Sequence, residues 1–135
     1  NDKPQRDFIH ISDVVKANIS AIEVDSPITT VNIGSGKITS ISDIANSLAH
    51  SMGKEANITS KGEFRIGDIL SCTADISKAR ESIGFNPNTP LKEGMLEFVN
   101  WAKHEQSFDL YDKAVEALNN HSLFNTDNNN GIEVE

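Results

Sequence analysis

The segment 41–52 constrains the fold of this chain most strongly, because its apolar residues recur at the spacing of a single helix face. Thr39 or Ser40 can cap the start of this helix, and Gly53 can end it. The stripe predicts a short amphipathic helix that packs one face against a core. No apolar run in the sequence approaches the roughly 18 residues of a membrane-spanning helix, so we expect no membrane partner.

Strand and helix patterns follow one another through most of the remaining sequence. Clustered or alternating β-branched residues predict strands at 6–11, 29–33 and 56–60. Apolar periodicity predicts further helices at 13–24, 76–83 and 90–102, and another across 108–118.

Capping residues mark the ends of these helices. Ser12 or Asp13 is expected to cap the helix 13–24, Asp75 the helix 76–83, and Thr89 the helix 90–102. Gly84 is expected to end the helix 76–83. The helix 13–24 carries one polar stripe that includes Asp13 and is apolar over most of its remaining surface, so we expect it to be covered on several sides.

Composition limits the partners and the compartment. The 135 residues suffice for one modest domain, and a formal charge of −8 argues against nucleic acid or an anionic membrane surface as the main partner. Cys72 is the only cysteine, so no internal disulfide forms and a reducing compartment fits. The sequence shows no secretory signal, and we expect a cytoplasmic location. Because it opens with loop-like residues and without Met, we also expect a piece of a longer protein.

The segment 65–68 holds the most informative functional groups. Arg65 offers a fork of N–H donors that matches two phosphate oxygens, Gly67 permits a sharp turn, and Asp68 is an acceptor suited to a pair of sugar hydroxyls. Arg6 supplies a second guanidinium. With no reactive nucleophile nearby, this set predicts binding of a phosphorylated, hydroxylated ligand. The simpler alternative is that each arginine makes a structural ion pair, with Asp7 or Asp68.

Other candidate sites carry weaker signals. Gly34-Ser35-Gly36 lies between a predicted strand and a predicted helix, as a dinucleotide-binding loop does. Thr39 stands where the third glycine belongs, so the expected role of the segment is a turn. The four histidines lack metal-ligand spacing, and we expect no metal site.

Four segments of the sequence, which include the residues discussed above, form an ordered set. They are Arg6-Asp7-Phe8-Ile9-His10-Ile11-Ser12-Asp13-Val14, then Val31-Asn32-Ile33-Gly34-Ser35-Gly36, then Arg65-Ile66-Gly67-Asp68 with Ala74-Asp75-Ile76-Ser77-Lys78-Ala79, and finally Ile83-Gly84-Phe85-Asn86-Pro87 with Leu91-Lys92-Glu93-Gly94. In order and spacing this set resembles the C-terminal part of the extended short-chain dehydrogenase/reductases, the family of NAD-dependent nucleotide-sugar epimerases and dehydratases. The resemblance covers roughly residues 5–103.

The resemblance implies an α/β fold, namely the C-terminal part of a Rossmann-type extended dehydrogenase. This part would comprise a small mixed α/β substrate-binding domain and an edge of the cofactor-domain sheet. The resemblance also implies that Arg6 and Arg65 bind the diphosphate of a UDP- or dTDP-linked sugar, and that Asp68 binds the nucleotide ribose. We expect residues 1–105 to form the nucleotide-sugar-binding portion, 106–120 an extra helix and 121–135 a disordered tail.

The chain departs from the family in what it lacks. The family's glycine-rich cofactor loop and its catalytic Tyr-x-x-x-Lys pair lie upstream of every matched segment, and the only tyrosine, Tyr111, is followed by Val115 in place of Lys. We therefore expect no catalytic, cofactor-binding or metal-binding residue here. The intact parent is predicted to be an NAD-dependent epimerase or dehydratase, of which this chain alone would be inactive.

The partners expected in that parent are NAD, the missing N-terminal half and the sugar nucleotide, with a homodimer as a further candidate. Two alternatives remain open. One is a non-catalytic module that recognises a nucleotide or a protein. The other is a purely structural α/β domain, in which Arg6 and Arg65 lie far apart, each paired with a neighbouring carboxylate.

Overall fold

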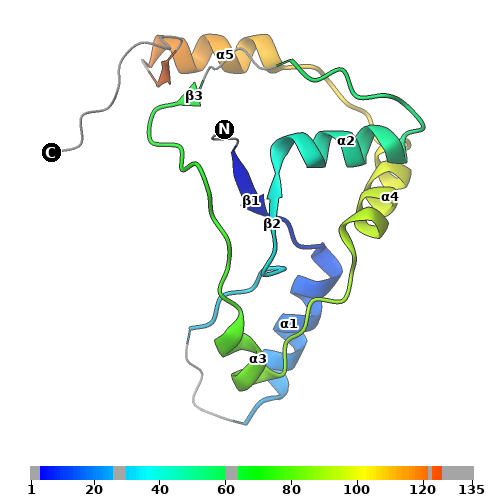
Figure 1. Ribbon diagram of the computed structural model, residues 1–135, viewed down its shortest axis with the longest axis vertical. Helices are drawn as coiled ribbons and strands as arrows, with labels where there is room; N and C mark the ends of the chain where they lie inside the picture. The colour runs from blue at the N-terminus through cyan, green and yellow to red at the C-terminus, as the bar shows by residue number, and fades with distance from the viewer. Residues whose placement is uncertain (1–3, 26–29, 60–63, 122, 126–135) are drawn as a thin grey trace, which may run out of the picture.

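The structure is a computed structural model that describes residues 4–25, 30–59, 64–121 and 123–125. Its helices are α1 (Ile11–Glu23), α2 (Ile41–Ser51), α3 (Ser77–Ile83), α4 (Leu91–Ala102) and α5 (Tyr111–Asn120). Its strands are β1 (Gln5–Asp7), β2 (Ile38–Ser40), β3 (Phe64–Arg65) and β4 (Phe124–Asn125). Figure 1 shows α1 and α3 at one end of the molecule, α5 with β3 at the other, and β1 and β2 between them.

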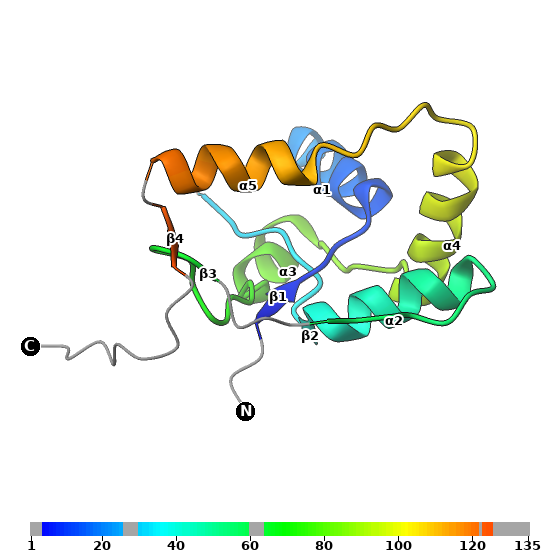
Figure 2. The same ribbon diagram turned by 90° about the horizontal axis from the view of Figure 1, so that it is seen from above.

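Two short antiparallel ribbons replace the three predicted strands. In the first ribbon β1 pairs with β2, with Arg6 opposite Thr39, and the other edge of β1 forms a parallel bridge from Gln5 to Ser71. In the second, β3 pairs with β4. Figure 2 shows β3 and β4 together near one end of α5, apart from the first ribbon. The described residues thus form a mixed α/β structure, as predicted, with very little sheet.

The strand predictions are wrong in extent, and each error has a physical reason. The strand expected at 6–11 stops at Asp7, and a helix already begins at Ile11. Residues 30–33 and 56–59 join no ladder among the described residues, so their β-branched side chains make no strand; residues 29 and 60 lie outside the description. Val31 and Ile33 instead pack against the core. The strand β2 was not predicted, because its three residues read as the approach to the helix cap.

One predicted N-terminal cap, Ser40, and one predicted terminal glycine, Gly84, are confirmed. The Ser40 hydroxyl accepts a hydrogen bond from the Asp43 N–H at 3.0 Å at the start of α2. Asp75, the predicted cap of α3, does not occupy the cap position, which is Ile76, and no side chain of a described residue makes a cap hydrogen bond there. Asp75 Oδ1 does accept from the Ser77 N–H at 2.9 Å just before the helix, and this hydrogen bond lowers the pKa of Asp75. Gly84 ends α3 with a φ of +64°, as the sequence predicted.

The caps predicted for α1 and α4 are wrong. The residue at the start of α1 is His10, whose ring Nδ1 accepts from the Ser12 N–H at 3.4 Å. The residue before α4 is Pro90, and no side chain of a described residue caps that helix. The Thr89 hydroxyl, predicted to cap it, lies 3.2 Å from the Ser12 hydroxyl. The segment that leads into α4 and the start of α1 are therefore joined by the Ser12 and Thr89 side chains.

The buried carboxylate of Asp13, on α1, also contacts the segment that leads into α4. Asp13, which belongs to the polar stripe predicted for α1, is only 1% exposed. Its Oδ2 accepts from the Asn88 and Thr89 N–H groups at 3.0 and 2.8 Å, and its Oδ1 accepts from Lys16 Nζ at 3.1 Å. Asp13 therefore holds the segment that leads into α4 against α1.

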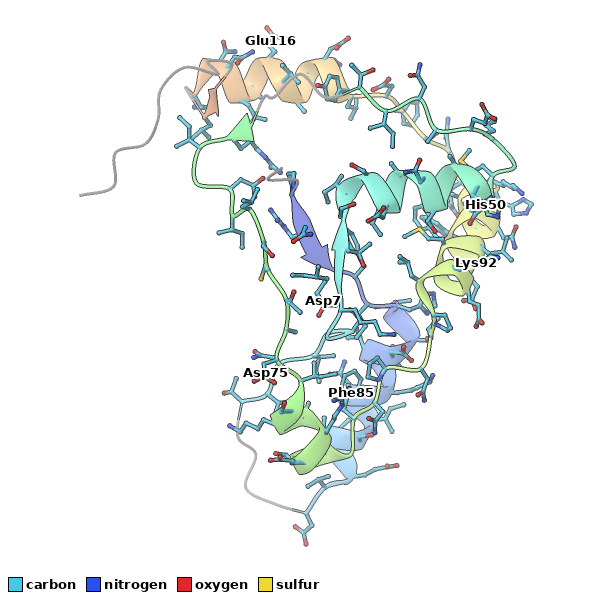
Figure 3. The ribbon with its side chains drawn as sticks, viewed as in Figure 1. Asp7, His50, Asp75, Phe85, Lys92 and Glu116 are labelled. Atoms are coloured by element: carbon cyan, nitrogen blue, oxygen red, sulfur yellow. The ribbon has the colours of Figure 1, made fainter. Side chains whose placement is uncertain are left out.

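The buried core lies between α1 and α3. It consists of Ala17, Ile76, Ala79 and Phe85, and Figure 3 shows Phe85 placed beside both helices. A second packing contact joins α2 to α4, where Val99 is buried.

The outer face of α1 is not covered by any described residue. Its exposed apolar side chains are Ile11, Val15, Ile19 and Ile22. The prediction that this helix is covered on several sides is therefore wrong for the part of the chain that the structure describes. None of the described helices has the length and apolarity required to cross a membrane.

The C-terminal helix is confirmed, with α5 beginning at Tyr111 rather than near 108. In the segment 121–135, predicted to be a tail, Phe124–Asn125 form β4 against β3. Residues 126–135 lie outside the description, so the predicted disorder of that tail is not tested there.

Candidate functional site

Arg6 and Asp68 meet although they stand far apart in the sequence. Arg6 Nη2 lies 2.8 Å from Asp68 Oδ1, and its Nη1 donates to the carbonyl oxygens of Gln5 and Leu70 at 2.8 and 3.2 Å. The guanidinium is partly buried, with 26% of the side chain exposed, against 43% for Asp68. Two of the three residues predicted to contact a ligand therefore lie in direct contact.

A tight turn presents Asp68 to Arg6. The Asp68 N–H donates to the Arg65 carbonyl oxygen at 3.1 Å, and Gly67 between them has a φ of +82°. A residue with a Cβ avoids that conformation, which explains the glycine. The chain then runs beside β1, where the Gln5 N–H donates to the Leu70 carbonyl oxygen at 2.8 Å and the Cys72 N–H donates to the Gln5 carbonyl oxygen at 3.3 Å.

Arg65 is not brought into contact with Arg6. It lies on β3, opposite Phe124, and its exposed side chain makes no hydrogen bond or ion pair with any described residue. The ion pair that was considered as a structural alternative does exist for Arg6, with Asp68 as its partner. For Arg65 the structure shows no such pair within the described ranges.

The neighbouring carboxylate of Asp7 has a role that the sequence did not reveal. Its Oδ1 accepts from the Ser35 N–H at 2.7 Å and from the Ser35 hydroxyl. Its Oδ2 accepts from the Gly36 N–H at 2.9 Å and from the Ala74 N–H at 3.2 Å. Figure 3 shows Asp7 at the centre of the molecule, where β1, the loop before β2 and the segment before α3 converge. Adjacent residues of a strand point to opposite faces, so Asp7 faces inward where Arg6 does not.

The electrostatics of Asp7 follow from these contacts. Burial raises the pKa of the Asp7 carboxyl, but the hydrogen bonds from Ser35, Ala74 and Gly36 together outweigh burial and leave that pKa below its ordinary value. Asp7 is therefore ionised near neutral pH and holds its donors by charge-assisted hydrogen bonds.

The Gly34-Ser35-Gly36 loop does not fit a dinucleotide. The Ser35 and Gly36 N–H groups, which such a loop would offer to a pyrophosphate, already donate to Asp7. Gly34 is required for a different reason, because a Cβ there would lie 2.5 Å from Ala74 Cβ. The loop is a structural turn, as expected.

An open hollow of about 500 Å³ lies beside Arg6. Its polar lining includes Asn32, Thr73 and the exposed thiol of Cys72. The size falls within the range of small-molecule pockets. Among the described residues, no three His, Cys, Asp or Glu side chains gather as a metal ion would require.

Comparisons with known proteins agree on one family, although no family model matches the sequence. The putative UDP-glucose 4-epimerase of Methanocaldococcus jannaschii is 38% identical over 99 residues, which cover 73% of this chain and 31% of that protein. The dTDP-L-rhamnose 4-epimerase of Burkholderia thailandensis is 32% identical over 102 residues, covering 74% of this chain and 28% of that protein.

The fold gives the same result as the sequence. The crystal structure of UDP-glucose 4-epimerase from Bifidobacterium longum, in complex with NAD⁺ and UDP, matches with a TM-score of 0.66 and 26% identity. The match covers 75% of this chain and 30% of that one. The chain spans about a third of the length of the proteins it matches, and over that span it belongs to the extended short-chain dehydrogenase/reductases, the family of NAD-dependent nucleotide-sugar epimerases.

Proposed function

We propose that this chain is the C-terminal, substrate-binding portion of an NAD-dependent nucleotide-sugar epimerase or dehydratase. The observation that carries the proposal is the contact between Arg6 and Asp68, which joins the two segments that resemble the family's diphosphate- and ribose-binding motifs. Arg6 and Arg65 would hold the diphosphate, and Asp68 the ribose hydroxyls. The ligand would be a UDP- or dTDP-linked sugar.

In this proposal Asp68 changes partners when the ligand binds. Without ligand its carboxylate neutralises Arg6, so no buried guanidinium is left without a counter-charge. A diphosphate would replace that carboxylate at Arg6 and free Asp68 for the hydroxyls. The exposed Arg65 side chain, on the turn that ends at Asp68, would close over the diphosphate from the other side.

Two surfaces support a larger parent protein. The apolar face of α1, which includes Ile11, is exposed. Beside it lies a mainly apolar hollow of about 530 Å³ that Ile11, Phe98 and Trp101 help to line. Apolar surface of this kind is typical of an interface. We assign it to the N-terminal half, which would bring NAD and the acid–base residues; NAD would supply hydride chemistry there, while the residues described here bind and orient the sugar nucleotide.

Titration calorimetry with UDP tests the site in the longer protein that carries this sequence. We expect Arg65→Ala to weaken UDP binding about 10- to 100-fold, the range for a charge-assisted hydrogen bond of about 1.5–3 kcal/mol. Arg6→Lys keeps the charge but loses the fork, and should also weaken binding. The matched control is Lys103→Ala, which removes an exposed cation at the end of α4. Equal UDP affinities for wild type and Arg65→Ala would refute the proposed site.

The length of the polypeptide made in the source cells distinguishes this proposal from a stand-alone module. An immunoblot of the source cells should reveal a polypeptide roughly two and a half times the length of this chain, since 99 matched residues make up 31% of one relative and this chain has 135 residues. A product of 14.7 kDa that binds UDP without NAD would instead favour the non-catalytic module.

A further inference from the structure

A third hollow, of about 280 Å³, shares no lining residue with the hollow beside Arg6. It lies between the loop before β2, one side of α3 and the segment leading into α4. Its polar lining residues are Ser35, Lys37, Thr39, Arg80, Asn86, Asn88 and Thr89. Two cations line it and no carboxylate does, although the chain carries a formal charge of −8. We call it the Lys37–Arg80 hollow.

The two cations are not neutralised by the residues that the structure describes. Neither Lys37 nor Arg80 makes a side-chain hydrogen bond or an ion pair there, and both side chains are exposed at the hollow. Arg80 offers a planar fork of donors and Lys37 a compact ammonium, a pairing that suits a tetrahedral oxyanion.

A helix N-terminus adds donors at the same place. Pro90, the residue before α4, and Leu91, its first residue, line the hollow. Within the described ranges no side chain caps α4, so the N–H groups of its first turn lack the acceptor that a cap from those residues would supply. The N-terminus of a helix also favours negative charge. An anion in this hollow would thus meet two side-chain cations and the start of a helix.

The walls of the hollow are held in place by the two inward-facing aspartates. Asp7 fixes the Ser35 backbone at 2.7 Å, and Asp13 fixes the Asn88 backbone at 3.0 Å. Both carboxylates are committed to these contacts behind the walls, and neither lines the hollow. A site whose walls are already fixed loses little entropy when it binds.

From these observations we infer that the Lys37–Arg80 hollow binds the phosphate group of a small metabolite. Its volume lies near the lower limit of small-molecule pockets, which suits a phosphate monoester rather than a dinucleotide. The inference does not rest on the proposed sugar-nucleotide site, and either one can fail without the other.

The test uses inorganic phosphate as the probe and the full chain labelled with ¹⁵N. Phosphate is titrated at constant ionic strength against chloride, and amide shifts report the site. We expect saturable shifts at Lys37, Arg80 and Leu91, and Lys37→Gln or Arg80→Gln should weaken binding about tenfold or more. Arg65→Gln is the matched control: it removes a guanidinium of the other proposed site and should leave these shifts unchanged.

Three results would overturn the inference. One is the absence of saturation at these amides. Another is a phosphate affinity that stays within twofold of wild type in both the Lys37→Gln and the Arg80→Gln protein. The third is equal binding of acetate, which would mark a general attraction for anions rather than a phosphate site. Unchanged amide spectra without phosphate show that the variants remain folded.

Discussion

Replacing Asp13 by alanine is the sharpest test of how this domain is held together. The carboxylate lies inside the contact between α1 and the segment before α4, and accepts hydrogen bonds from the Asn88 and Thr89 N–H groups and from Lys16. Alanine removes every one of these acceptors. Asn88 is exposed and Thr89 half-buried, so water can reach the freed N–H groups in part.

The magnitude follows from these contacts. A buried donor left without its partner costs about 1–3 kcal/mol. Because water can reach the two freed N–H groups in part, we expect the lower end of this range, about 1 kcal/mol for each. The half-exposed pair with Lys16 adds less than about 1 kcal/mol. Asp13→Ala should therefore lower the free energy of unfolding by about 2–3 kcal/mol. Asp13→Asn keeps an amide oxygen for both N–H groups and should cost only about 1 kcal/mol.

Urea unfolding followed by circular dichroism at a single pH measures both values. The control is Asp25→Ala, which removes an exposed carboxylate that makes no hydrogen bond with a described residue. An Asp13→Ala protein within about 0.5 kcal/mol of wild type, a deviation normal for surface substitutions, would refute the reasoning. So would an asparagine variant as unstable as the alanine variant, because the size of the effect is assigned to the lost acceptor and not to the lost charge.

Two further predictions concern the same framework. Gly34→Ala should lower the free energy of unfolding by about 2 kcal/mol, because its Cβ would lie 2.6 Å from Asp7 Oδ2. Gly53→Ala, whose Cβ meets nothing within 4 Å, should cost only the backbone strain of about 1 kcal/mol. Calorimetric melting compares the two variants. Burial raises the pKa values of Asp7 and Asp13, but their hydrogen bonds outweigh burial and lower both values below 3.8. The two ionised carboxylates therefore stabilise the folded state fully above pH 3.8, and this contribution is lost as the pH falls through their lower pKa values in the folded protein. Unfolding free energies from about pH 6 down to about pH 3 should show this loss, reduced in Asp13→Asn; a flat profile would contradict it.

The sequence predicted the helices better than the strands, and the reason lies in where their stabilising partners are. The helix 41–52 has its cap, its stripe and its terminal glycine within the segment itself, and α2 matches it closely. A strand needs a partner from elsewhere in the chain. Residues 30–33 have the side chains of a strand but no ladder partner among the described residues, and β2 lacks any local signal.

The same distinction applies to the candidate site. Arg6 and Asp68 were selected by motif, and their contact is a finding of the structure. Asp7 was considered only as a partner for Arg6, because nothing in the local sequence shows that its donors come from Ser35, Gly36 and Ala74. Asp13 was assigned to a polar stripe, since a buried carboxylate cannot be distinguished from an exposed one by helical periodicity alone.

Because Arg6 and Asp7 are neighbours on β1, a substitution that disturbs the structure at Asp7 will also change the ligand affinity attributed to Arg6. Arg6 carries the charge proposed to contact a substrate, and Asp7 holds two remote stretches of backbone, at Ser35 and at Ala74, against its own strand. A change that loosens these contacts, such as Asp7→Asn, would tilt the strand and carry the guanidinium with it. Such a variant would register as a loss of ligand affinity although no ligand-contacting group had been altered, and only a parallel measurement of folding would reveal the true cause.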